Sequence, residues 1–593
     1  DWSFIGTTEI SGGIASFPDS TNSFLIQNFV VDLSVKNYKL TYEVVSTNGS
    51  NFRLAGGNSA FGTVTLDSST IGTKTAYLTS NGTKQNLQFN NNNFVGSIDN
   101  VSVQQVSDTS GIMENMNPDN IVAFSPPDPD PLVGDEFIFS VNTAQSGVSN
   151  SDQFQLPLIS AGTLDFTVIW GDGTQDIITS YNQAETLHTY PSSGTYTIGI
   201  RANTQPLKGF KFDAGGDKFK MANIVNWGGS NFRLDQQEAF YGCSNMTCTA
   251  TDAPLITATV FYRMFRGCAN FNGDLSNWDV SGVTSFNQMF FGCNAFTGKG
   301  LENWDISSAD AIEYMFYNCS NFNGQIGGWD TSGVNNMRHV FQLCSIFNQD
   351  ISSWDTSLVT RMTSMFQEAF EFNQPLNSWD VSSCVDFASM FKNTPQFNQP
   401  LNNWTIKNDA EIDMNAMFFN ANRFNQDVSM WDVSRVRYMQ YMFFSCADMS
   451  FGFDGWDTSS VDNFYKFANS TDVLDTSFGY LDISSALQLG LFKDGGQTIS
   501  TENYNNTLIG WAAQTVNPNL TTSFGSATYS YSAFDARNTL TSAPNNWAIT
   551  DGGYVPTDNA FQFTVNPNLQ TLGNELVPSI ITTEDNNGGV INY

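Results

Sequence analysis

Tryptophans recur at nearly constant spacing through the middle of the chain, and this repeat limits the fold more than any other feature. Successive tryptophans lie 26, 25, 25, 25, 25, 27 and 25 residues apart in the series Trp278, Trp304, Trp329, Trp354, Trp379, Trp404, Trp431 and Trp456. A column of phenylalanines keeps the same period from Phe240 to Phe443. A unit this short cannot bury its own apolar face, so consecutive units must stack into a solenoid with parallel strands.

One unit, residues 347–371, reads FNQDISSWDTSLVTRMTSMFQEAFE. Its first eight residues alternate apolar and polar side chains, which predicts a short strand. Asp355 is typical of a helix cap, and Val359, Met362 and Met365 recur at the spacing of one helical face. The repeat therefore predicts a strand, a turn and a short helix in every unit.

Cysteines form a third column, three residues after the phenylalanine column. They stand at Cys243, Cys268, Cys293, Cys319, Cys344 and Cys446, while Ala369, Thr394 and Ala421 fill the position in other units. Exchange with small residues indicates packing, so the column is predicted to hold no disulfides. The CxxC pairing of a metal site is absent, and both histidines stand at non-equivalent places, which disfavours metal or redox chemistry.

Two polar columns accompany the aromatic ones. The asparagines Asn272, Asn323, Asn348, Asn373, Asn398 and Asn425 are interpreted as ladder residues that satisfy backbone groups in neighbouring coils. An aspartate follows most of the tryptophans, with Thr405 breaking the series. Its Asp-x-Ser context favours a helix cap or an Asx-turn, and a calcium-binding row of carboxylates is the alternative.

These motifs, W-D-x-S followed by M-F-x-x-C and F-N-Q, resemble the repeats of BspA-type leucine-rich-repeat surface proteins. The resemblance covers roughly residues 220 to 480 and implies a surface or secreted adhesion molecule. Similar repeats occur in phage structural proteins. The resemblance does not identify a ligand.

A second resemblance precedes the repeats. Alternating runs over residues 164–170 and 195–200 predict strands. The motif Trp170-Gly171-Asp172-Gly173, followed by His188-x-Tyr190, resembles a PKD-type β-sandwich, which is an extracellular spacer module. Trp170 is interpreted as a core residue and His188 as a structural strand residue, because no nucleophile or acidic pair accompanies it.

A third resemblance lies at the start of the chain. The segments NYKLTYEVV and GSIDNVSVQQV are similar to the middle and final strands of a carbohydrate-binding-type jelly roll. The resemblance implies a first strand before Trp2, so we expect the sequence to start inside a domain. It also implies that Asp99, on the last strand, ligates a structural calcium. This calcium is the only cofactor predicted.

The predicted fold is multidomain and β-rich. It comprises a carbohydrate-binding-module-like jelly-roll β-sandwich (1–106), a Pro-rich linker (107–135), a PKD/Ig-like β-sandwich (136–205), an α/β leucine-rich-repeat-like solenoid (206–480), a C-terminal cap (481–554) and a tail (555–593). A short helix is predicted over residues 504–513 of the cap.

Charge and missing motifs exclude several functions. The formal charge of −33, with 57 acidic against 24 basic residues, repels nucleic acid and anionic lipid. The sequence contains no run of eighteen consecutive apolar residues, so no transmembrane helix is expected. No GxSxG, HExxH or phosphate-binding loop is present. An unmarked acid pair in a glycan-degrading enzyme is the remaining catalytic alternative.

The sequence thus predicts a non-catalytic adhesion or structural protein on a virion surface, or extracellular on a cell surface. The first interpretation is a phage virion fibre or capsid decoration protein that serves host attachment. The alternative is a bacterial cell-surface adhesin of the BspA type. The expected partners are a glycan or cell-surface receptor, virion or surface scaffold proteins, and further copies of the chain.

Overall fold

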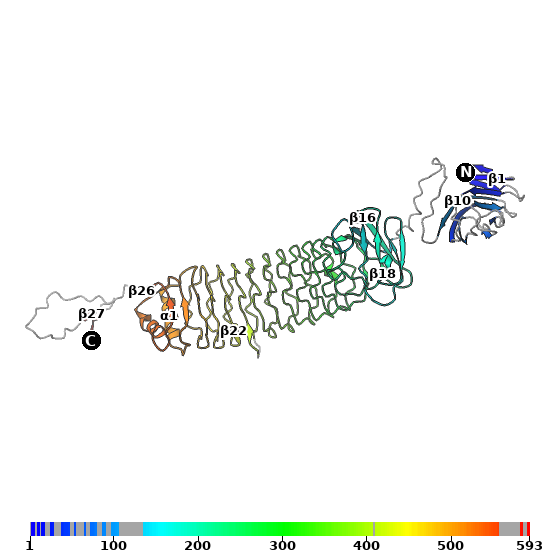
Figure 1. Ribbon diagram of the computed structural model, residues 1–593. Helices are drawn as coiled ribbons and strands as arrows, with labels where there is room; N and C mark the ends of the chain where they lie inside the picture. The colour runs from blue at the N-terminus through cyan, green and yellow to red at the C-terminus, as the bar shows by residue number, and fades with distance from the viewer. Residues whose placement is uncertain are drawn as a thin grey trace, which may run out of the picture. The chain divides into compact units, whose positions relative to one another are not determined.

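The computed structural model describes residues 134–406 and 410–556 in full (Figure 1). Outside these ranges it describes the backbone of the strands named below, with the side chains of Tyr42, Thr73 and Lys74. The chain divides into two compact units, Asp1–Pro127 and Asp128–Tyr593.

The first unit contains two five-stranded antiparallel sheets. One has the order β1 (Trp2–Ile5), β4 (Phe24–Asn28), β9 (Asn86–Asn90), β6 (Phe52–Leu54), β7 (Val64–Leu66). The other has the order β2 (Glu9–Ser11), β3 (Ile14–Phe17), β10 (Gly96–Gln105), β5 (Asn37–Thr47), β8 (Gly72–Thr79). The two segments that resemble jelly-roll strands are β5 and β10, which pair directly with each other. Tyr42 on β5 is buried.

A six-stranded sheet opens the second unit. Its order is β14 (Gln175–Ile178), β13 (Phe166–Ile169), β16 (Thr195–Ala202), β11 (Phe137–Asn142), β17 (Met221–Asn226), β19 (Thr247–Cys248). Two short strands, β12 (Gln153–Gln155) and β15 (Leu187–Thr189), pair with each other in a separate sheet; along the chain β12 follows β11 and β15 precedes β16. Strand β11 pairs antiparallel with both β16 and β17, and β17 pairs parallel with β19. The sheet therefore continues from the region predicted as a sandwich into the first coils of the repeats.

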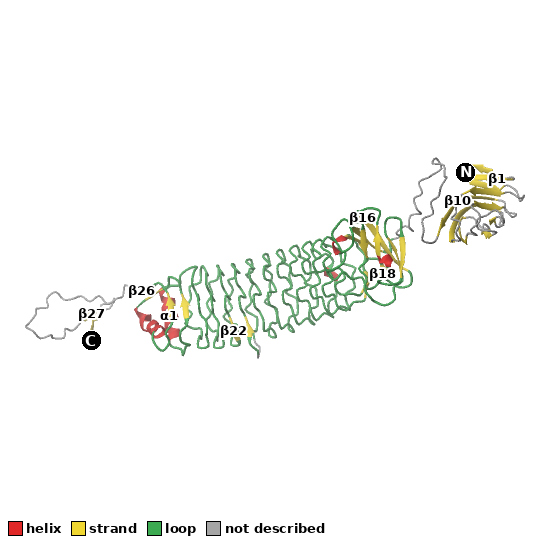
Figure 2. Ribbon diagram, in the orientation of Figure 1, coloured by secondary structure: helices red, strands yellow, loops and turns green. Residues whose placement is uncertain are grey.

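The repeats form a β-solenoid of about 13 turns, with almost no helix (Figure 2). Parallel pairing also joins β18 (Gly229–Leu234) to β20 (Pro254–Ile256) and β21 (Ile412–Asp413) to β22 (Val436–Tyr438). Between and beyond these strands one residue per coil carries the parallel pairing, through Val260, Ser285, Ala311, Asn336, Arg361, Asp386, Asp413, Tyr438, Asn463 and Gln488. The repeats thus stack in register.

The predicted strand over residues 347–354 is wrong. Its buried side chains are Phe347, Ile351 and Trp354, at spacings of four and three residues rather than two. Turns shape this segment, because Asp350 accepts a hydrogen bond from the backbone N–H of Ser352 at 2.9 Å. The parallel bridge of this coil lies further along, at Arg361.

The predicted helix from Val359 to Phe366 is also wrong, and the solenoid is not α/β. Every second N–H donates to the next coil: Met362, Ser364, Phe366 and Glu368 donate to the carbonyls of Asp386, Ala388, Met390 and Lys392 at 2.8–2.9 Å. The N–H groups of Met365 and Gln367, which lie between them, close tight turns on the carbonyls of Met362 and Ser364. Ser364 (φ 52°) and Glu368 (φ 61°) have left-handed backbone, which an α-helix does not allow. We call this segment of each coil the turn ribbon.

The turn ribbon gives a backbone prediction. The substitution Glu368→Gly should stabilise the protein by up to about 1 kcal/mol. Relief of the left-handed backbone strain at this position outweighs the added conformational freedom of the unfolded chain. Gln367→Gly is the matched control. It removes the same Gln367–Glu368 side-chain hydrogen bond, but at a position without positive φ, so it should cost about 0.5–1 kcal/mol. Urea denaturation measures both, and equal destabilisation by the two variants would contradict this backbone geometry.

Both described helices longer than one turn close the end of the stack. Helix α1 (Thr501–Ala512) confirms the helix predicted over residues 504–513, and α2 (Phe534–Thr541) packs against it. The Ser500 side chain caps α1 by accepting a hydrogen bond from the N–H of Asn503. Strands β23 (Thr521–Ser523) and β25 (Ala548–Thr550), and β24 (Thr528–Tyr529) and β26 (Gly553–Tyr554), continue the parallel pairing.

Among the described residues, the remaining short elements are four 3-10 helices and one hairpin. The 3-10 helices are η2 (Ala184–Thr186), η3 (Lys218–Lys220), η4 (Leu301–Asn303) and η5 (Tyr531–Ala533). The hairpin is β27 (Thr582–Glu584) with β28 (Val590–Asn592).

Candidate functional site

The tryptophan column lies inside the solenoid. Each of the eight predicted ladder tryptophans is at most 4% exposed. From Trp304 to Trp456 each indole N–H donates to a carbonyl of the preceding coil at 2.8–3.1 Å. Among the described residues the indole nitrogen of Trp278 has no such acceptor. The indoles are therefore used in joining coils and offer no platform to a ligand.

The cysteine column is a row of hydrogen-bond donors. The Sγ atoms of Cys268, Cys293, Cys319 and Cys344 lie 2.9–3.0 Å from the carbonyl oxygens of Phe240, Phe265, Phe290 and Phe316 in the preceding coils. Thr394 makes the same bond to Phe366 at 2.7 Å. Sequence reasoning assigned the column to packing and missed this bond. The appearance of threonine among the cysteines was the available signal.

Burial makes these thiols unreactive. All eight cysteines are free and buried. Burial raises the pKa of every column thiol above its ordinary value, and it raises that of Cys248 and Cys384, which lie outside the column, to about 12. The thiolate is the reactive form. The column therefore carries no nucleophile.

The asparagine column links coils through side-chain oxygens. The Oδ1 atom of Asn348 accepts hydrogen bonds from the N–H of Asn373 at 3.0 Å and from the Gln374 side chain at 2.9 Å. Asn323, Asn373 and Asn398 do the same for the coils that follow them. The amide oxygens are thus occupied within the stack.

The aspartate column forms Asx-turns. Asp355 accepts a hydrogen bond from the N–H of Ser357 at 2.9 Å, and the pattern recurs at Asp279, Asp305, Asp330, Asp380, Asp432, Asp457 and Asp482. The serine hydrogen bonds lower the pKa of Asp355 from its ordinary value. The turn's stability is therefore present above the ordinary pKa of aspartate and is lost as the pH falls through the lowered value.

The WGDG motif follows β13 in the six-stranded sheet, with Trp170 buried, Gly171 exposed and Asp172 half-buried. Trp170 is fully buried and stacks on the His188 ring at 4.5 Å. The Nε2 atom of His188 lies 2.8 Å from an oxygen of Asp172, and the Tyr190 hydroxyl donates to the Trp170 carbonyl. These residues satisfy one another, as expected for core residues.

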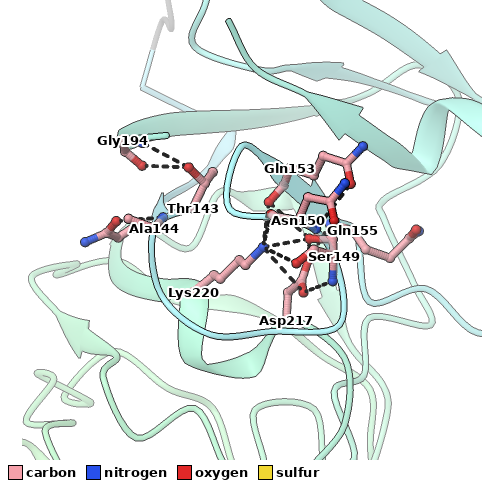
Figure 3. A network of polar contacts seen from close by, with 10 residues as sticks. Thr143, Ala144, Ser149, Asn150, Gln153, Gln155, Gly194, Asp217 and Lys220 are labelled. Carbon is pink, nitrogen blue, oxygen red and sulfur yellow. Dashed lines mark hydrogen bonds and ion pairs between the residues drawn. The ribbon is translucent and has the colours of Figure 1, made fainter. Parts of the chain in front are cut away.

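A buried ion pair fastens the loop before β12 to the first coil (Figure 3). Lys220 and Asp217 are both fully buried. The Lys220 ammonium donates to the carbonyls of Ser149, Asn150 and Gln153 at 2.7–3.1 Å. Asp217 accepts from the Ser149 hydroxyl at 2.6 Å. Sequence reasoning missed this site because the loop residues that the pair binds lie 62 or more residues away in the chain.

A second buried lysine gives a pH prediction. Lys493 is 3% exposed and donates to the carbonyls of Thr471 and Gln497 at 2.7 and 2.8 Å. Burial lowers its pKa to about 8, and Asp472 and Asp475 oppose the shift. Between pH 8 and about pH 10 the unfolded state binds the extra proton, so the C-terminal coils should become more stable as pH rises. Lys493→Met should abolish this rise in melting temperature, and an unchanged slope would contradict the assignment.

The exposed surface of the turn ribbon carries aromatic and basic side chains that sequence reasoning did not single out. The Arg266 guanidinium lies over the Phe291 ring at 3.8 Å, and Phe291 stacks on Tyr317 at 4.3 Å. Lys392 lies over Phe419 at 5.2 Å, and Phe419 stacks on Phe444 at 4.6 Å. The signal was the residue after each ladder phenylalanine, which is aromatic or basic in most coils.

The predicted calcium ligand Asp99 is not part of the site described above. The side chain of Asp99 lies outside the described residues, although β10 carries its backbone opposite Glu43. Within the described ranges no group of three or more His, Cys, Asp or Glu side chains is arranged to hold a metal ion. No described helix is long and apolar enough to cross a membrane.

The repeats match one family description. The overlapping segments 234–332, 317–413 and 411–505 match the family model described as "Mycoplasma protein of unknown function, DUF285". No curated protein and no solved structure matches the chain. The β-solenoid is therefore a stack of DUF285 repeats.

Proposed function

We propose that this chain is a non-catalytic structural and adhesion protein, displayed outside a cytoplasm, whose solenoid is a rigid spacer and binding surface. One observation carries the proposal: the Trp, Cys and Asn columns form hydrogen bonds from coil to coil, with Trp278 as the exception among the tryptophans. Trp354 donates to the Ile326 carbonyl, Cys344 to that of Phe316, and Asn348 accepts from Asn373. A repeat that uses its polar and aromatic columns internally acts through its outer faces and its ends.

The terminal modules fit the same function. Two five-stranded antiparallel sheets support a carbohydrate-binding-type jelly roll in residues 1–106. The buried Trp170, stacked on His188, supports a PKD-type module. The turn-ribbon repeats support a BspA-type assignment, with stacked coils in place of the strand–helix units of the sequence prediction. A glycan or cell-surface receptor is the proposed partner, together with scaffold proteins or further copies of the chain.

We place the protein first on a phage virion, as a fibre or capsid decoration that serves host attachment. The family description, which names a Mycoplasma protein, favours the alternative of a bacterial cell-surface adhesin. The virion protein and the adhesin would share one architecture and would differ in whether the surface that displays them belongs to a phage or to a bacterium.

Immunogold labelling with an antibody to residues 1–106 tests the proposal on source particles and cells. Label along a capsid or tail supports the virion assignment, and label on a cell envelope supports the adhesin. A cytoplasmic location would contradict display. Turnover of a polysaccharide by the purified chain would contradict the non-catalytic assignment.

A further inference from the structure

The residue that follows each ladder phenylalanine lies on the outer side of the turn ribbon. Backbone hydrogen bonds fix this column in register: the N–H groups of Gly242, Gly267 and Gly292 donate to the carbonyls of Arg266, Phe291 and Tyr317 at 2.7–2.8 Å. These members of the column therefore stand in consecutive coils, one above another. All are half-buried, so part of each side chain reaches solvent.

The first aromatic run comprises Tyr241, Arg266, Phe291 and Tyr317, and we call it the N-terminal strip. The Arg266 guanidinium lies between two rings, 3.8 Å from Phe291 and 5.7 Å from Tyr241. Phe291 and Tyr317 stack with ring planes 16° apart. A neighbouring stack of Tyr314 on His339, at 4.2 Å, widens the surface.

The second run comprises Lys392, Phe419 and Phe444. Together with Lys466, which precedes Phe467 and so stands beside the column rather than in it, we call it the C-terminal strip. Phe419 and Phe444 stack with ring planes 11° apart. Lys392 lies over Phe419 at 5.2 Å, and Lys466 lies over Phe444 at 5.6 Å. Cations held over aromatic faces are ordered and keep part of their charge available to solvent.

The cations of the strips differ from those beside them. Arg263, Arg338 and Arg437 pair with Glu238, Glu313 and Glu411 respectively. Among the described residues, no ion pair forms at Arg266, Lys392 or Lys466, whose contacts are rings and, for Arg266, the Gln288 amide. Three cations without carboxylate partners, in a chain of formal charge −33, mark a surface that attracts anions.

We propose that the two strips bind one class of ligand, an anionic polysaccharide, whose acidic groups pair with Arg266, Lys392 and Lys466 and whose sugar rings contact the solvent-facing edges of Phe291, Tyr317, Phe419 and Phe444. A linear polymer of rings and charges matches a column that presents rings and cations at one coil per step. The proposed display outside a cytoplasm favours a polysaccharide over nucleic acid, the other polymer that stacks on aromatic side chains. This inference rests on the proposed adhesion function and assigns it a surface and a ligand class.

Binding of the full chain to immobilised hyaluronan and heparin tests the proposal, with dextran as the neutral probe. We expect both anionic polymers to bind, with affinity falling at high ionic strength, and dextran not to bind. The triple variant Arg266→Gln, Lys392→Gln, Lys466→Gln should bind at least about tenfold more weakly, because three unpaired cations are removed. The ring variant Phe291→Ser, Phe419→Ser should weaken binding to a similar extent.

Gln367→Ser is the matched control, because Gln367 belongs to the same column between the two strips. It should leave binding unchanged. Equal affinity of the control and the triple variant would overturn the proposal, as would tight binding of dextran or stronger binding of single-stranded DNA. Absence of binding to both anionic polymers, in a chain that still attaches to its source particle or cell, overturns this inference alone. Failure of the chain to attach anywhere overturns the adhesion function as well.

Discussion

Replacing Trp354 by alanine should destabilise the central coils by about 3–5 kcal/mol, the usual loss for a large buried aromatic side chain. The indole is 3% exposed and stacks between Trp329 at 6.2 Å and Trp379 at 6.5 Å. Its N–H donates to the Ile326 carbonyl at 3.0 Å. The substitution removes the ring from the ladder and one of the two donors to that carbonyl, which keeps the Trp329 N–H at 3.2 Å.

The loss should be local at first, because each coil contacts only its neighbours. Hydrogen exchange, read peptide by peptide, should show faster opening centred on residues 326–379, and urea denaturation gives the total cost. Trp354→Phe is the matched control. It keeps a ring in the stack but loses the N–H donor, and should cost about 1–3 kcal/mol. An alanine variant that melts like the parent protein would place Trp354 on the surface.

Lys220→Met should cost about 3–5 kcal/mol, because it leaves the Asp217 carboxylate buried without its cation. Three carbonyls, of Ser149, Asn150 and Gln153, each lose one hydrogen-bond donor in the same step. The loop before β12 should detach from the first coil. Limited proteolysis should then cut within residues 143–152, and urea denaturation should report the loss of stability.

The double variant Asp217→Asn, Lys220→Met separates charge from packing. Removing both charges should leave the protein more stable than Lys220→Met alone, because no uncompensated carboxylate remains. Additive losses in the double variant would show that the two side chains do not act as a pair.

The period of the repeat was sufficient to predict a stacked solenoid, but not the conformation of its unit. Val359, Met362 and Met365 are buried at helical spacing in a segment that is not helical, because a run of tight turns buries the same positions. A helix and a run of tight turns differ in the acceptors to which alternate backbone N–H groups donate. Here these N–H groups donate to carbonyls of the next coil, so the sequence pattern within one repeat could not reveal them.

Long-range polar pairs were equally hard to predict. Lys220 and Ser149 meet across 71 residues, and no local pattern connects them. The aromatic and basic residues of the turn ribbon were accessible from the sequence, because they follow the ladder phenylalanines at a fixed offset. Exposed positions are free to vary from coil to coil, so this column gives a weaker repeat signal than the buried columns, whose residues stay constant.

Thiol alkylation tests most directly the central claim that the repeated columns are internal ladders. The full chain is treated with iodoacetamide without reductant, first folded and then in denaturant, and the added groups are counted by intact mass. Eight buried and free thiols predict no label on the folded protein and eight labels on the denatured protein. Label on Cys268, Cys293, Cys319 or Cys344 in the folded protein, or fewer than eight labels after denaturation, would contradict the account.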